Sequence, residues 1–137
     1  MINDFAKQLK ALHKPSTPII FPNVWDVASF NTVVSLNSSS SKPVKALATA
    51  SWAIAASLGI KDEDLTLEQN FDAVAKVATL CKAAGIPLSA DLQDGYGEQI
   101  AATVKRAIEV GVVGANIEDT IPATGAFYPI DEQVQRL

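Results

Sequence analysis

The feature that most limits the fold of this chain is a structural unit that repeats four times along it. Each unit has a short apolar run, a turn with polar residues or glycine, and then a segment of helical periodicity. This order is typical of consecutive βα units. The apolar runs predict strands at residues 18–22, 44–49, 87–91 and 114–118.

Helical periodicity predicts a helix after each strand and one before the first. The predicted helices cover residues 4–13, 25–35, 67–84 and 97–110, and a last one begins near Asp131. The helix at 67–84 has the clearest boundaries, because Thr66 and Gln69 can form a capping box and Gly85 can end it.

The predicted strands are apolar with little alternation, which is typical of parallel strands covered on both faces. The sequence therefore predicts an α/β fold of about four βα units of parallel strands, preceded by an N-terminal helix. A closed (β/α)₈ barrel needs eight units and about 250 residues. We expect a partial TIM barrel, with residues 1–137 as the N-terminal half of a single barrel domain.

A barrel that stops after four strands has open sheet edges and an apolar inner face. Residues expected to need a partner layer are Ile20, Leu47, Leu88 and Ile117. We therefore expect a homo-oligomer, and expect this chain alone to lack the activity of a whole barrel.

Charge and composition limit the partners. The formal net charge of −4, with no basic stripe, argues against nucleic acid. The longest apolar-rich stretch, 46–60, falls short of the roughly 20 residues that a bilayer requires. The single cysteine, Cys81, fits a reducing compartment. We expect a cytoplasmic protein with a small-molecule ligand and no membrane partner.

Carboxylates stand at the ends of the third and fourth predicted strands. Ser89, Asp91 and Gln93 share one face of the third strand by their period of two, and Asn116 and Glu118 share one face of the fourth. In parallel βα folds, the loops after the strands build the active site. Two carboxylates at equal height on strands about 4.8 Å apart suit one hard cation, directly or through its waters.

Plainer interpretations of both segments stay open. Residues 91–97 can form an ordinary strand-to-helix turn, with glycines at positive φ and Asp94 as a local cap. The Glu118-Asp119 pair can be an acidic loop that favours the N-terminus of the next helix. Their matching positions at two strand ends favour the cation site.

An unusually long connection follows the second predicted strand. Its surplus lies in residues 51–65, on the side where the active site is expected. We interpret residues 59–65 as a mobile lid. The polar stretch at 37–43 lies on the opposite side and is interpreted as a plain linker.

Four segments resemble successive signatures of the phosphoenolpyruvate mutase/isocitrate lyase superfamily. In family order they are Pro22-Asn23-Val24-Trp25-Asp26, Ala56-Ser57-Leu58-Gly59-Ile60-Lys61-Asp62, Ala90-Asp91-Leu92-Gln93-Asp94-Gly95-Tyr96-Gly97 and Asn116-Ile117-Glu118-Asp119. Together they extend over nearly the whole chain. The Asp-x-x-x-Gly-Tyr-Gly loop with a later Ile-Glu-Asp is the most specific part.

The resemblance implies a Mg²⁺ or Mn²⁺ site. Asp91 would be the direct ligand, Glu118 would act through bound water, and Gln93 would hydrogen-bond a metal water where many relatives have Asp or Glu. Asp62 would match the aspartate of the gating loop, so the implied catalytic residues are Asp62, Asp91 and Glu118. The implied substrate-binding residues are Ala50, Ser51, Trp52 and Asn116.

Members of this superfamily bind an α-oxo acid or its enolate and form or break a neighbouring C–C or P–C bond. The resemblance thus implies a Mg²⁺-dependent lyase or phosphonomutase acting on an α-oxo acid or a phosphonate. Oxaloacetate decarboxylase-like and carboxyphosphonoenolpyruvate phosphonomutase-like activities both fit. The Lys-Lys-Cys-Gly-His motif of isocitrate lyases is absent after Glu118, which disfavours isocitrate or methylisocitrate cleavage.

Two other hypotheses remain. The chain can be a truncated, inactive paralogue or fragment that only binds metal or associates with other chains. It can also be a small doubly wound binding domain, although the four motifs argue against that interpretation.

Overall fold

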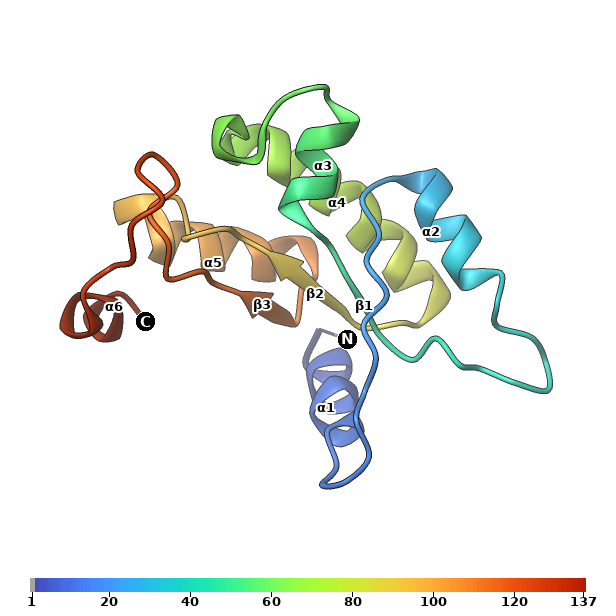
Figure 1. Ribbon diagram of the computed structural model, residues 1–137. Helices are drawn as coiled ribbons and strands as arrows, with labels where there is room; N and C mark the ends of the chain where they lie inside the picture. Colours follow the sequence, from blue (N-terminus) through green and yellow to red (C-terminus); the bar gives the residue numbers. More distant parts are fainter. Residues whose placement is uncertain (1) are drawn as a thin grey trace.

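The computed structural model describes residues 2–137 and contains a short open sheet of three parallel strands (Figure 1). The strands are β1 (Leu47–Ala48), β2 (Leu88–Asp91) and β3 (Gly114–Asn116), in the order β1-β2-β3. Their register pairs Leu47 with Leu88 and Asp91 with Asn116. The parallel α/β architecture predicted from the sequence is confirmed for these three strands.

The strand predicted at residues 18–22 is not formed. The chain there makes only an isolated parallel bridge, between Asn23 and Ala48. Two hydrogen bonds hold it, from the Val24 N–H to the Ala48 carbonyl at 2.9 Å and from the Ala48 N–H to the Pro22 carbonyl at 3.1 Å. Pro18 and Pro22 bring no N–H to a ladder, which explains why the apolar run does not extend into a strand.

The helices are α1 (Ile2–Leu12), α2 (Val27–Val34), α3 (Ser51–Ser57), α4 (Leu67–Ala84), α5 (Ile100–Val110) and α6 (Ile130–Arg136). Two 3₁₀ turns, η1 (Asp62–Asp64) and η2 (Gly97–Gln99), precede α4 and α5. The long connection at 51–65 is thus largely helical, which the sequence pattern did not indicate.

Helix α4 has the boundaries that its sequence predicts. The Gln69 N–H donates to Thr66 Oγ1 at 3.3 Å, and the Thr66 N–H donates to Gln69 Oε1 at 3.0 Å, completing the capping box. Gly85 ends the helix in the left-handed region, at φ 71°. Helix α2 begins two residues later than predicted, because Asp26 caps it by accepting the Ser29 N–H at 2.7 Å.

The core lies between the sheet and α4. Along β2, Leu88 and Ala90 are buried while Ser89 and Asp91 are half-buried. Leu47 and Leu88 belong to the same buried cluster as the apolar side of α4, whose members include Phe71, Val74, Val77, Ala78 and Cys81. The prediction that Leu47 and Leu88 need a further partner layer is therefore wrong, since α4 already covers them.

Ile20 and Ile117 differ from those two leucines. Ile20 is 78% exposed, because the strand predicted for it is absent, and Ile117 is partly buried against the core. Within residues 2–137, no helix is both long enough and apolar enough to cross a bilayer.

Candidate active site

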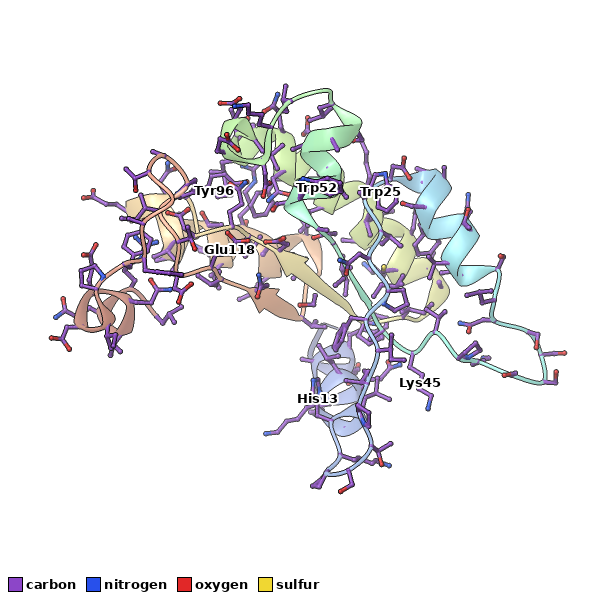
Figure 2. All side chains as sticks on the ribbon, viewed as in Figure 1. His13, Trp25, Lys45, Trp52, Tyr96 and Glu118 are labelled. Carbon is purple, nitrogen blue, oxygen red and sulfur yellow. The ribbon has the colours of Figure 1, made fainter. Side chains whose placement is uncertain are left out.

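The carboxyl ends of the strands bring the predicted site residues together. Figure 2 shows Trp52, Tyr96 and Glu118 on one side of the molecule and His13 and Lys45 on the opposite side. This arrangement follows from the parallel sheet, in which the loops after all strands lie on one edge.

The sequence predicts Asp91 and Glu118 at equal height on neighbouring strands. This prediction is wrong, because the two residues lie at different heights. The register places Asn116 opposite Asp91, because β3 ends at Asn116. Glu118 follows two residues later, and its N–H donates to the Gln93 carbonyl at 2.7 Å. Glu118 therefore lies beside the loop that follows β2.

The Asp91 carboxylate is fixed on both oxygens. Its Oδ2 accepts the Ser51 N–H at 3.0 Å and the Ser51 hydroxyl at 3.1 Å, and its Oδ1 accepts the Gln93 N–H at 3.1 Å. The Asp91 N–H donates to Thr49 Oγ1 at 3.0 Å, and its carbonyl accepts Asn70 Nδ2 at 3.1 Å. Ser51 and Gln93 thus preorganise the carboxylate, while Thr49 and Asn70 hold the backbone of Asp91.

Asp62 reaches the same place from η1. Its Oδ2 lies 3.3 Å from the Ser51 hydroxyl, which also contacts Asp91. The Gln93 amide, Nε2, donates to the Asp62 carbonyl at 2.7 Å and to Asp62 Oδ1 at 3.0 Å. The segment 59–65 is also anchored by Leu65, which is 3% exposed, so only its polar middle lacks packing. Its role as a mobile lid stays a prediction.

Negative charge accumulates around Glu118. Burial raises the pKa of its carboxyl, and the charges of Asp91, Asp62, Asp94 and Asp119 raise it further. A carboxylate whose charged form is disfavoured by its neighbours gains from a bound cation. The electrostatics therefore support the cation site that the strand ends predicted.

The donor set fits a hard divalent cation that shares its coordination with water and substrate. Asp91, Gln93 and Glu118 offer only oxygen ligands, as Mg²⁺ and Mn²⁺ prefer. Within the part of the chain that the structure describes, no three His, Cys, Asp or Glu residues form a group that could hold a metal. Mg²⁺ is commonly held by one or two carboxylates and keeps several waters, so an all-protein cage is not required.

The loop after β2 has an unusual backbone. Gln93 and Tyr96 lie in the left-handed region at φ 50° and 62°, where residues other than glycine are uncommon. Gly95 has no alternative, because a Cβ there would lie 2.6 Å from Cγ1 of Ile100. The glycine-dependent turn predicted for 91–97 is confirmed, with Gly95 and Gly97 at φ 84° and 68°.

A network behind this loop was missed by sequence reasoning. Asp94 is 4% exposed and accepts the Tyr96 N–H at 2.8 Å, the Gly97 N–H at 3.2 Å and the Tyr128 hydroxyl at 2.7 Å. The Arg136 guanidinium lies 3.8 Å from the centre of the Tyr128 ring and 3.6 Å from Asp94 Oδ2. The local cap at Asp94 was predicted, but nothing in the sequence pattern linked it to Tyr128 or Arg136.

The predicted substrate-binding residues differ in their surroundings. Ser51 is 1% exposed and directly contacts Asp91, while Ala50 is the half-buried residue that precedes α3. Asn116 is exposed opposite Asp91, and the Trp52 side chain is 70% exposed. The structure thus brings Ser51 and Asn116 next to Asp91, and leaves the Trp52 indole largely in solvent.

Tyr96 belongs to the Gly-Tyr-Gly loop of the sequence signature, but no role was predicted for its side chain. Its hydroxyl is buried beside the Asn70 side chain but outside hydrogen-bond geometry, and it has no partner within residues 2–137. Burial raises the pKa of this phenol, followed by the charges of nearby carboxylates, so the hydroxyl stays protonated.

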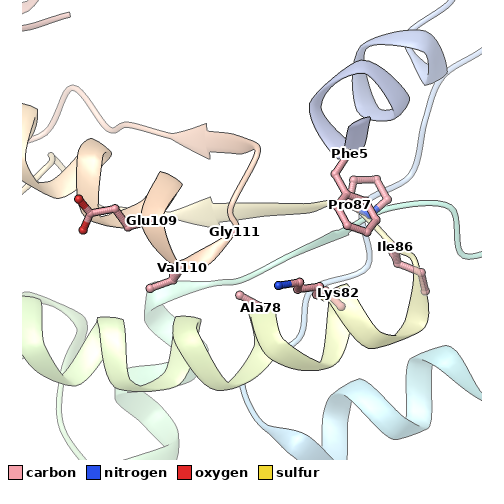
Figure 3. Close-up of a pocket in the computed structure, with 9 residues that line it drawn as sticks. Phe5, Ala78, Lys82, Ile86, Pro87, Glu109, Val110 and Gly111 are labelled. Atoms are coloured by element: carbon pink, nitrogen blue, oxygen red, sulfur yellow. The ribbon is translucent and has the colours of Figure 1, made fainter. Parts of the chain in front are cut away.

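A separate cavity of about 140 Å³, with Lys82 and Glu109 among its lining residues, lies between α1, α4 and α5 (Figure 3). Its lining includes Phe5, Ala78, Cys81, Pro87 and Gly111, and the last two lie just before β2 and β3. Burial raises the pKa of the Cys81 thiol to about 12, so this group is a packed apolar side chain and not a nucleophile. The cavity is at the opposite end of the strands from Asp91 and Glu118.

Parallel strands joined by crossover helices, with carboxylates at and after their carboxyl ends, define an α/β protein built on an open parallel sheet. The chain matches the model of the phosphoenolpyruvate phosphomutase family over residues 9–137. It belongs to the phosphoenolpyruvate mutase/isocitrate lyase superfamily, as the four sequence segments indicated. No curated protein sequence matches it significantly.

Solved structures agree with this assignment. A candidate phosphonomutase from Burkholderia cenocepacia J2315 is 30% identical with a TM-score of 0.85, and the alignment covers 99% of this chain and 52% of that protein. Oxaloacetate acetylhydrolase is 33% identical with a TM-score of 0.81, covering 96% of this chain and 45% of the enzyme. 2,3-Dimethylmalate lyase is 24% identical with a TM-score of 0.79, over 98% and 45%, and supports the fold alone. The chain spans about half the length of these structures.

Proposed function

We propose that this chain carries the metal-binding half of a Mg²⁺-dependent enzyme that acts on an α-oxo acid through an enolate, forming or breaking a C–C or P–C bond. The observation that carries the proposal is the Asp91 carboxylate, which Ser51 and Gln93 fix close to Glu118. Burial and the neighbouring carboxylates raise the pKa of Glu118. One similar structure is named for its action on oxaloacetate and another as a candidate phosphonomutase. Both substrate classes share an oxo acid that can chelate a cation.

Asp91 would be the direct ligand, since its carboxylate is already oriented by bonds to the flanking segments. Glu118 would act through a metal-bound water, and Gln93 lies between the two. A divalent cation, Mg²⁺ or Mn²⁺, would neutralise the charge that develops on the enolate oxygen. Asp62 would be the acid or base nearest to the substrate on the lid side.

The substrate's carboxylate would bind where α3 begins, at Ala50, Ser51 and Trp52, and Asn116 would contact the substrate from β3. The Ser51 N–H donates to Asp91 in this structure, so a bound carboxylate would have to share or replace that bond. The exposed indole of Trp52 leaves its backbone as the contacting group. The lid segment would exclude water from the reactive enolate.

A second candidate function is metal binding or association without turnover. It is favoured by an exposed apolar stripe, formed by Ile130 and Val134 of α6 and by Leu137 directly after that helix. Such a stripe suits association with another chain or another part of the same protein. Homo-oligomerisation remains a prediction, which light scattering tests.

Turnover assays separate the two functions. Oxaloacetate and phosphonopyruvate are offered with Mg²⁺ and with EDTA to the wild-type chain, to Asp91→Ala, and to Asp131→Ala as an exposed control. The first function predicts Mg²⁺-dependent turnover of one substrate that only Asp91→Ala abolishes. Metal binding without turnover of either substrate supports the second function, and turnover that survives Asp91→Ala contradicts the assigned site.

A further inference from the structure

We propose that Gln93 is a positioning residue whose side-chain amide holds Asp62 against the Asp91 carboxylate, so that the segment 59–65 is closed over the site without a cation. The inference rests on the proposed function for the meaning of that site, although the contact itself does not depend on turnover.

Both hydrogen bonds that the Gln93 side-chain amide donates go to the same residue, Asp62. Nε2 donates to Asp62 twice, to the backbone carbonyl at 2.7 Å and to Oδ1 at 3.0 Å. Both acceptors belong to the first residue of η1, in the middle of the segment 59–65. The Gln93 side chain is buried, with the residue 4% exposed, so water does not replace these bonds at low cost.

The backbone conformation of Gln93 orients its side chain toward Asp62. Gln93 has φ 50°, and its N–H donates to Asp91 Oδ1 while its carbonyl accepts the Glu118 N–H. Its backbone N–H is therefore tied to the Asp91 carboxylate, and its carbonyl is tied to the backbone of Glu118. The same residue connects Asp91, Glu118 and, through its amide, Asp62.

An amide and a carboxylate at position 93 have opposite effects on Asp62. A carboxylate has no proton to donate at neutral pH and would face two acceptor oxygens of Asp62 at hydrogen-bond distance. It would also add a charge to a site where four other carboxylates already raise the pKa of Glu118. Compared with a glutamate, the Gln93 amide offers the cation no negative charge, but it donates two hydrogen bonds to Asp62.

The Ser51 hydroxyl approaches Asp62 from the other side. The Ser51 hydroxyl lies 3.3 Å from Asp62 Oδ2 and 3.1 Å from Asp91 Oδ2. Its single proton serves one carboxylate at a time, so it cannot fix Asp62 alone. The two donations from Gln93 leave Ser51 available to Asp91.

Hydrogen exchange of the full chain, measured without divalent cation, tests this role. The variants are Gln93→Glu, which keeps the shape and reverses the hydrogen-bonding sense, and Gln93→Leu, which removes the donor without adding charge. Gln99→Glu makes the same chemical change at an exposed position in η2 and serves as the control. The amides of 59–65 should exchange at least about tenfold faster in both Gln93 variants, because two buried bonds are lost. The amides of α4 should change less than threefold, and Gln99→Glu should behave as wild type.

A reversed pair separates positioning from general destabilisation. Asp62→Asn combined with Gln93→Glu supplies a donor at 62 for the acceptor at 93, and should recover protection of 59–65 relative to Gln93→Glu alone. A double-mutant cycle measures that coupling. Wild-type exchange of 59–65 in both Gln93 variants overturns the proposal, and so does equal acceleration of 59–65 and α4 with no recovery in the reversed pair. If the wild-type chain shows no turnover or does not bind a divalent cation, that result counts against the proposed function instead.

Discussion

Ser51 donates two hydrogen bonds to a single oxygen of Asp91, from its backbone N–H at 3.0 Å and from its hydroxyl at 3.1 Å to Oδ2. The residues are 40 positions apart, so this pair ties the start of α3 to the end of β2. It also sets the direction in which the carboxylate faces the site.

Ser51→Ala should lower the free energy of unfolding by about 1 to 2 kcal/mol, because a buried bond to a charged group is lost while the N–H bond remains. Urea denaturation measures the change. Ser40→Ala removes a hydroxyl from an exposed loop and should have an effect within about 0.5 kcal/mol of zero. Equal effects of the two substitutions would show that the Ser51 hydroxyl does not stabilise the site.

Glu118→Gln should raise the melting temperature at neutral pH when no divalent cation is present. The folded protein raises the pKa of Glu118, first by burial and then through neighbouring carboxylates, so the charged form weakens folding. The stabilising contribution of the protonated group is present below the ordinary glutamate pKa and is lost as pH rises through the raised value.

Melting curves measured across pH therefore test both the direction of the stability change in Glu118→Gln and the pH range in which it occurs. The advantage of Glu118→Gln should disappear at pH values where Glu118 is protonated, and excess Mg²⁺ should stabilise the wild type more than the variant. Glu109→Gln, at an exposed position, is the matched control. A variant that is less stable than wild type at neutral pH would contradict the electrostatic description.

Tyr128→Phe should lower the free energy of unfolding by about 1.5 kcal/mol, because Asp94 is buried and loses its 2.7 Å bond from the Tyr128 hydroxyl. Tyr96→Phe provides the comparison. The Tyr96 hydroxyl is buried without a hydrogen-bond partner in the described chain, so its removal should be neutral or stabilising. If Tyr96→Phe proves the more damaging substitution, the two hydroxyls have been assigned wrongly.

The elements that could be predicted from the sequence are those with local signals. Thr66, Gln69 and Gly85 lie next to the ends of α4 and fix both of them. Pro18 and Pro22 carried an equally local signal against a full strand at 18–22, which the apolar run outweighed in the prediction. The rule that catalytic groups follow parallel strands predicts Asp91 and Glu118 at one edge of the sheet.

The remaining features depend on contacts between distant segments. Tyr128 and Arg136 meet Asp94 across 34 and 42 positions, and no periodicity or motif encodes such a pair. Register decided the height of Glu118 in the same way, since β3 ends at Asn116 and sets Glu118 beside Gln93. The resemblance gave Ser51 a role in substrate binding but not its bonds to Asp91.

Divalent-cation affinity at Asp91 tests the central claim most directly. Mn²⁺ is titrated into the wild-type chain, Asp91→Asn and the exposed control Asp131→Asn, with free Mn²⁺ followed by electron paramagnetic resonance. The site predicts one Mn²⁺ bound by the wild type and by the control, and an affinity at least about 100-fold weaker for Asp91→Asn, because the direct ligand loses its charge. Equal Mn²⁺ affinity of Asp91→Asn and wild type would contradict the assignment of this carboxylate as the metal ligand.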